Sequence, residues 1–150
     1  MNWLRHQIHI RRRKQDGSLY AVTASAAASN GSCNNVSITP KVTVQILDGL
    51  SQNQDLTLHC KSKDDDLGVH TIKKKKATYE FTFRPRYFIH STQFFCSFWW
   101  PSNTSLHCFD IYMQDRDWCC AVCFWTIWES GPCISDDLTG YIDCYPWNSV

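Results

Sequence analysis

The sequence contains no run of apolar residues long enough to cross a membrane. A transmembrane helix needs about 20 consecutive, mostly apolar residues, and no stretch of the 150 residues approaches this. An excess of charge of one sign is also missing, because 15 Lys and Arg against 14 Asp and Glu leave a formal net charge of +1. A nearly neutral chain has no general electrostatic reason to bind nucleic acid or an anionic membrane. We therefore expect no membrane span and no nucleic-acid partner.

Common enzyme motifs are missing too. The chain has no Gly-x-Ser-x-Gly, no glycine-rich phosphate loop and no His-Glu-x-x-His. His59 directly precedes Cys60, but neighbouring residues of a strand point to opposite faces, so the two make a poor base and nucleophile. We expect no enzymatic activity, no catalytic residue and no cofactor. A thiol enzyme that uses Cys120 is kept as an alternative.

Cysteine, by contrast, is abundant, with nine residues. Cytosolic proteins rarely keep so many unless they bind metal or carry out redox chemistry. Zinc is disfavoured because the cluster at residues 119–123 lacks a second Cys-x-x-Cys knuckle. A redox role is disfavoured because Cys120-x-x-Cys123 lies in a strand pattern and not at a helix start. The count therefore favours disulfides, no metal site and a secreted protein.

The first 40 residues fit a secreted protein poorly. A signal peptide has a short basic region followed by about 7–15 apolar residues, whereas charged and amide residues interrupt residues 1–10 and four basic residues follow at 11–14. Residues 19–28 offer a faint apolar stretch with small residues suited to cleavage. We interpret residues 1–40 as an atypical leader with little order. Candidate glycosylation sites are the Asn-x-Ser triplets at Asn30, Asn35 and Asn103.

From Lys41 onward, apolar and polar residues alternate with period two in short segments that turn signals separate. No segment has the pattern of an amphipathic helix. We expect strands at 42–47, 56–60, 69–72, 79–83, 94–100, 106–113, 123–128 and 141–145, with Gly131-Pro132 stopping the seventh. This pattern predicts an all-β fold, an antiparallel β-sandwich of seven to eight short strands that disulfides stabilise, in one domain at 41–150.

Charged and polar loops are the candidate binding surfaces, because loops on a rigid sandwich often carry binding residues. The three aspartates of the 63–68 loop lack the Gly and Glu spacing of a calcium loop, so we interpret this loop as solvated. The run Lys73–Lys76 predicts a charged turn. The candidate recognition residues are Lys63, Asp64, Asp65, Asp66, Lys74, Lys75 and Asn103. Trp99, Trp100, Trp125 and Trp128 are expected in the core.

Seven short motifs in order carry a family resemblance. HCKSKDDDLG at 59–68 is followed by FTFRP at 81–85, FFC at 94–96, FDIY at 109–112, CAVCFW at 120–125, GPC at 131–133 and CYPWN at 144–148. From about residue 41 to 148 the chain resembles the plant self-incompatibility S1 proteins, also called S-protein homologues. The resemblance implies a small secreted β-sandwich with disulfides that meets a cell-surface receptor in pollen–pistil or related cell–cell signalling.

The resemblance also implies which cysteines form disulfides. The family's core cysteines correspond to Cys60, Cys96, Cys123 and either Cys119 or Cys120, and Cys133 with Cys144 resembles an additional C-terminal pair. Cys33 and Cys108 depart from the pattern, and the connectivity stays open. Alternatives to the receptor ligand are a secreted glycan-binding or apoplastic effector module, which exposure of Trp99 or Trp128 would favour, and a degraded copy without function.

Overall fold

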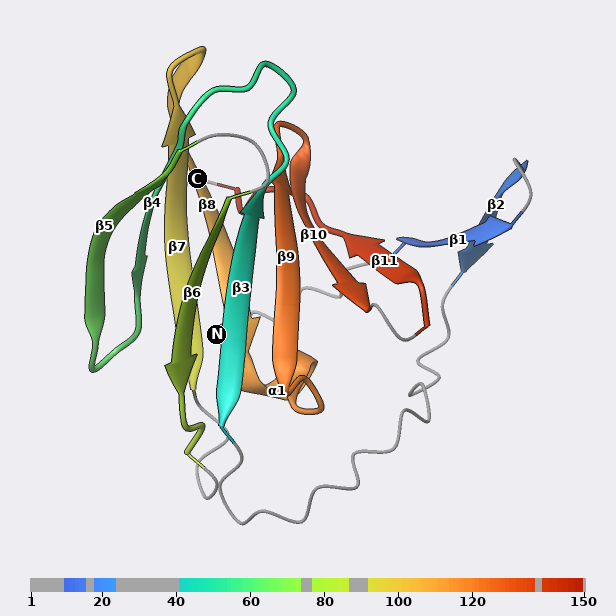
Figure 1. Cartoon of the computed structure of the whole chain (residues 1–150). Helices are drawn as coiled ribbons and strands as arrows, with labels where there is room; N and C mark the ends of the chain where they lie inside the picture. Colours follow the sequence, from blue (N-terminus) through green and yellow to red (C-terminus); the bar gives the residue numbers. More distant parts are fainter. Residues whose placement is uncertain are drawn as a thin grey trace.

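Two β-sheets form the fold of the chain (Figure 1). The computed structural model describes residues 10–15, 18–23, 41–73, 77–86, 92–136 and 139–149, the first two ranges by their backbone alone. The seven-stranded sheet has the order β2-β1-β11-β10-β9-β3-β6 and the four-stranded sheet the order β5-β4-β7-β8. The elements are β1 Ile10–Gln15, β2 Ser18–Thr23, β3 Val42–Asp48, β4 Leu56–Lys61, β5 Asp66–Ile72, β6 Thr78–Phe83, β7 Gln93–Trp100, β8 Asn103–Met113, α1 Gln114–Asp117, β9 Val122–Trp128, β10 Gly131–Asp136 and β11 Tyr141–Cys144.

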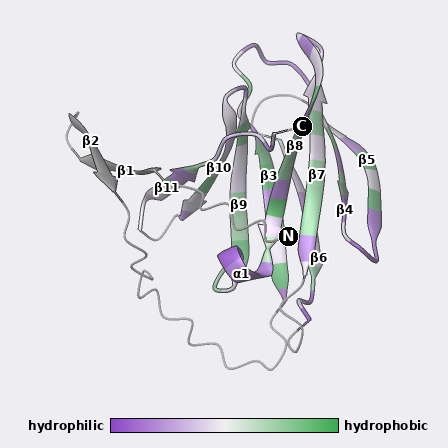
Figure 2. Cartoon of the chain, turned by 180° about the vertical axis from the view of Figure 1, so that it is seen from behind, coloured by the Kyte–Doolittle hydropathy of each residue, from purple (hydrophilic) through white to green (hydrophobic). Residues whose placement is uncertain are grey.

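The predicted alternation places the core between the sheets. Along β3, Val42, Val44 and Ile46 are buried, whereas the residues between them are half-buried on the outer side. Strands β4, β7 and β9 show the same period, and Figure 2 shows green and pale residues alternating along the strands. Each fully buried Ile, Leu or Phe contributes about 1.5–3 kcal/mol relative to exposure. The all-β sandwich is therefore confirmed.

Two features of the seven-stranded sheet differ from the prediction. Strand β3 pairs with β9 in parallel, while the other strand pairs of the described residues are antiparallel. The seventh predicted strand ends before Gly131-Pro132 as expected, at Trp128, but an unpredicted strand, β10, begins at Gly131 and pairs with β9. Gly131 has φ +139°, a conformation that glycine adopts readily, and the chain reverses there. Pro132 has no N–H to donate, but its carbonyl accepts a hydrogen bond from Tyr145 N. Among the described residues there are thus eleven strands, not seven or eight.

Two of the additional strands precede Lys41, where little order was expected. Strands β1 and β2 form a hairpin with Gln15 opposite Ser18, and β1 pairs with β11 through Arg11 and Arg12. Main-chain pairing needs no apolar side chains, so the apolar pattern of residues 1–40 did not predict the hairpin, although Asp16-Gly17 is a typical hairpin sequence. The remaining residues of this segment, including Asn30, Cys33 and Asn35, lie outside the described residues. None of the described helices is long and apolar enough to span a membrane.

Three disulfides have both of their cysteines among the described residues. Cys60–Cys96 joins β4 to β7, Cys133–Cys144 joins β10 to β11, and Cys120–Cys123 closes the start of β9. Cys119 is disulfide-bonded as well. Cys108 is the free cysteine of the described part of the chain, half-buried beside the Ser97 hydroxyl at 3.8 Å. These bonds restrict the unfolded chain and so stabilise a small sandwich.

Candidate recognition surface

The loops of the sandwich lie at its two ends (Figure 1). One end carries the β4–β5 turn, the β6–β7 connection and α1, and the other end carries the β7–β8 and β9–β10 turns. The predicted recognition residues do not gather at one place. Lys63, Asp64 and Asp65 lie at the first end and Asn103 at the second, whereas Lys74 and Lys75 lie outside the described residues. Among the predicted residues that the structure describes, those of the aspartate-rich turn lie beside an open cleft that other segments also line.

The β4–β5 turn is held by its own hydrogen bonds. Ser62 N donates to Asp65 O at 2.7 Å, and the Ser62 hydroxyl accepts hydrogen bonds from Asp64 N and Asp65 N. Asp66, predicted in the loop, is instead the first residue of β5. Its carboxylate binds His59 Nε2 at 2.6 Å and Gly68 N, and these hydrogen bonds, that of His59 first, lower the pKa of Asp66. The turn thus presents Asp64 and Asp65 from a defined backbone.

A second segment reaches the same turn from β6. Arg86 Nη2 donates to Asp64 Oδ2 at 2.6 Å, an ion pair between residues 22 positions apart. The backbone of Arg86 is fixed on both sides, since its N–H donates to Thr92 Oγ1 and its carbonyl accepts from Gln114 Nε2. Gln114 is buried and also accepts from Thr92 N. The guanidinium is therefore displayed from a constrained backbone while its side chain remains half in solvent.

Between these two segments lies an open cleft of about 700 Å³. Its lining includes Phe83, Phe94 and Phe95, and the ring centroids of Phe83 and Phe94 lie 4.5 Å apart. Charged residues of both signs surround these rings: Lys61, Lys63, Arg84, Arg86, Asp64, Asp65 and Asp110. An apolar floor with a few oriented charges suits recognition of another molecule. The described residues contain no group of three or more potential metal ligands.

An ion pair buried among aromatic rings supports this end of the sandwich. Arg116 of α1 binds Asp117 Oδ2 at 2.7 Å, and only 17% and 5% of the two side chains is exposed. The guanidinium lies 5.1–5.3 Å from the ring centroids of Phe109, Trp125 and Tyr145, within cation–π range. It also donates to the carbonyl of Asp110, which lines the cleft. Sequence reasoning missed Arg116, because no local pattern shows which rings surround it.

Comparison with known proteins identifies the family of the chain. The sequence model of the plant self-incompatibility protein S1 family matches residues 43–147. The chain belongs to the plant self-incompatibility protein S1 family. It is 44% identical over 124 residues to S-protein homolog 2 of Arabidopsis thaliana, covering 78% of this chain and 74% of the relative. It is 39% identical over 119 residues to S-protein homolog 29 of the same plant, covering 78% of this chain and 85% of the relative. It is 43% identical over 108 residues to S-protein homolog 5, covering 71% of this chain and 79% of the relative.

The remaining predicted residues of this S1-family chain lie away from the cleft. Asn103 is exposed at the β7–β8 turn, where its Oδ1 accepts from Ser105 N and its side-chain amide lies 3.2 Å from His107 Nε2. Trp100 and Trp125 are in the core as predicted. Trp99 is only half-buried, and Trp128 is wrongly predicted because 40% of it is exposed. Trp128 lies on the face of β9 that points away from the core, with Phe124 and Thr126, so the four-stranded sheet does not cover its ring.

Proposed function

We propose that this S1-family protein is a secreted, non-enzymatic recognition protein that binds a cell-surface receptor through the cleft between Ser62–Asp65 and Arg86. The disulfides support export, because such bonds persist in oxidising compartments. The observation that carries the proposal is the Arg86–Asp64 ion pair, which joins two constrained segments over an aromatic floor. Residues fixed before binding lose little conformational entropy on contact.

The charges of this cleft favour a protein partner in cell–cell signalling. Interfaces combine buried aromatic groups with a polar rim that determines partner choice more than affinity. The half-buried Phe83 and Phe95 supply the aromatic part, and Lys63, Asp65 and Arg86 supply exposed charges of both signs. A mixed pattern distinguishes receptors whose own charges complement it from those whose charges repel it.

Binding of the purified, oxidised protein to living cells of the plant's reproductive tissues tests this proposal. We expect saturable binding that disappears after brief protease treatment of the cells. Lys63→Glu and Arg86→Glu, tested separately, should weaken binding about tenfold, or 1.4 kcal/mol. Lys73→Glu is the matched control, because Lys73 is also exposed but lies at the other end of β5. Equal effects of Lys63→Glu and Lys73→Glu, or protease-resistant binding, would contradict the proposal.

A further inference from the structure

The outward face of the seven-stranded sheet carries rows of uncharged polar and apolar residues. The strand register brings Thr82, Thr43 and Val122 into one row and Glu80, Gln45 and Phe124 into the next. Residues directly opposite on paired strands share a face. The polar members bind each other, since the Thr43 and Thr82 hydroxyls lie 3.0 Å apart and Gln45 Nε2 donates to Glu80 Oε2. On β6, β3 and β9, Glu80 is the one charged residue of these two rows, and its carboxylate accepts a hydrogen bond from the neutral Gln45.

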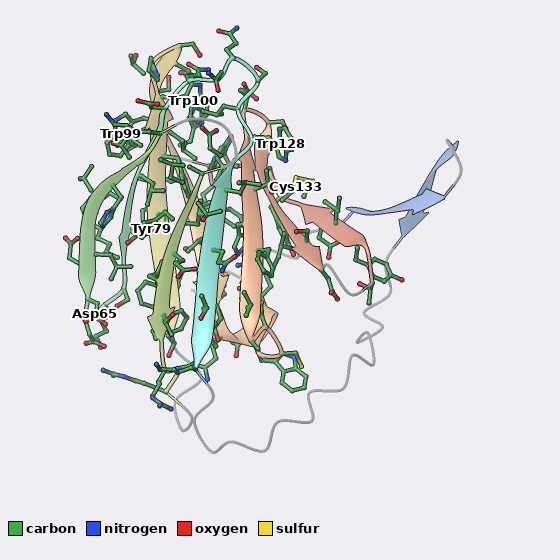
Figure 3. The ribbon with its side chains drawn as sticks, in the orientation of Figure 1. Asp65, Tyr79, Trp99, Trp100, Trp128 and Cys133 are labelled. Atoms are coloured by element: carbon green, nitrogen blue, oxygen red, sulfur yellow. A yellow bond between two sulfur atoms is a disulfide. The ribbon has the colours of Figure 1, made fainter. Side chains whose placement is uncertain are left out.

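At the end of β9 this face finishes in an exposed tryptophan. Trp128 follows Phe124 and Thr126 on the same side of the strand, and Figure 3 shows it at the β9–β10 end of the sheet. The indole lies against Gly49, where a Cβ would come within 3.0 Å of Trp128 Cδ2 and 2.6 Å of Thr126 Cγ2. Glycine therefore lets one side of the ring rest on the backbone, while 40% of the residue remains exposed.

We infer that this face binds a neutral oligosaccharide, with one sugar stacked on Trp128 and the chain running along β9. A pyranose presents C–H groups on its faces and hydroxyls around its rim, so it pairs with an aromatic ring flanked by hydroxyls and amides. Thr126, Thr43 and Gln45 supply such groups on the same face. The seven residues from Val122 to Trp128 extend over about 20 Å, which accommodates several sugars.

The composition of the face selects this ligand class over others. Nucleic acid and anionic polysaccharides need Lys or Arg to neutralise their charge. Strands β6, β3 and β9, along which the proposed chain lies, contain neither residue type, and Arg12 enters the Gln45 row only on the distant strand β1. The site is also separate from the proposed receptor cleft, because Asp65 lies at the opposite end of the sandwich from Trp128 (Figure 3). Loss of one binding activity therefore leaves the other measurable.

Affinity electrophoresis of the full chain in gels that contain a soluble neutral glucan, xyloglucan or mannan provides the test. We expect at least one of these polymers to retard the protein, and an acidic galacturonan not to. Calorimetric titration with the corresponding hexasaccharide then gives the dissociation constant. Trp128→Ala should weaken binding at least tenfold, because an aromatic platform supplies much of the contact.

Trp118→Ala is the matched control for this substitution. Trp118 is more exposed, at 67%, but it follows α1 at the other end of β9, so its removal should leave binding unchanged. Light scattering checks whether the face instead joins two copies of the chain. The inference is overturned if no neutral polymer retards the wild type, if both tryptophan variants lose binding equally, if only the acidic polymer binds, or if Trp128→Ala converts a dimer into a monomer.

Discussion

Two ion pairs of nearly equal length should differ in their value for stability because they differ in burial. Arg116–Asp117 spans 2.7 Å with 17% and 5% of the side chains exposed, whereas Arg86–Asp64 spans 2.6 Å with 56% and 52% exposed. Replacing Arg116 by Ala leaves the Asp117 carboxylate buried without its counterion, which costs about 3–5 kcal/mol. Replacing Arg86 by Ala breaks a solvated pair, which costs about 0–1 kcal/mol.

Further contacts of Arg116 support the upper part of that range. Its Nε donates to Asp117 Oδ1 at 2.8 Å, its Nη2 donates to Asp110 O, and three aromatic rings surround the guanidinium. Arg116→Lys keeps the charge but loses the forked geometry, so we expect an intermediate loss. Urea unfolding of the oxidised protein, followed by fluorescence, measures the free energy of unfolding of each variant.

The ratio between the losses in free energy of unfolding of the two alanine variants decides whether burial determines the value of these ion pairs. We expect Arg116→Ala to lower the free energy of unfolding at least three times as much as Arg86→Ala. If the two losses agree within about 0.5 kcal/mol, burial does not determine the value of these pairs and the reasoning fails. A large loss for Arg86→Ala would equally contradict it, since 56% of that side chain is exposed.

Three other predictions concern stability. Burial, and next the charge of Asp117, raise the pKa of Tyr112 to about 12, whereas Tyr112 in the unfolded chain ionises near pH 10, so the stability that the neutral phenol contributes is complete below pH 10 and is lost between about pH 10 and 12. Unfolding measured across this window should show that wild type loses about 2.7 kcal/mol more stability than Tyr112→Phe. Equal alkaline losses in both proteins would refute this prediction. Replacing Cys133 and Cys144 together by Ala opens a loop with a sequence separation of 11 and should lower the free energy of unfolding by about 3 kcal/mol in urea, whereas no change would refute a stabilising role. Gly131→Ala should cost on the order of 2–4 kcal/mol, because φ is +139° and a Cβ would overlap the Tyr145 carbonyl oxygen; a Tm equal to that of wild type would exclude this overlap.

Local patterns in the sequence predicted the strands whose side chains alternate between core and solvent. Strands such as β3 and β7 were predicted correctly, because one face of each is buried and burial of one face makes every second residue apolar. Strand β10 was missed because Pro132 was taken as a stop, although a proline at the second position of a strand needs no N–H partner there. The parallel pairing of β3 with β9 joins distant segments, and alternation within one strand carries no information about its partner.

The candidate site was predictable only in the parts that are local. Asp64 and Asp65 stood out because consecutive aspartates indicate an exposed turn. Arg86 and Arg116 did not, since their roles depend on contacts with distant segments. The exposure of Trp128 was missed because residue type alone predicted burial, whereas its exposure follows from its place on the outward face of β9, opposite to Trp125 and Ile127.

Transplanting the cleft tests the central claim most directly. Residues 62–65 and Arg86 are replaced together by the corresponding residues of another family member that binds different cells, and the dissociation constants of both parents and the chimera are measured on both kinds of cell. The cleft account predicts that the chimera loses affinity for the original cells and gains affinity for those of the donor, with its fold and Cys60–Cys96 disulfide unchanged. A folded chimera that keeps the original cell preference would contradict the account.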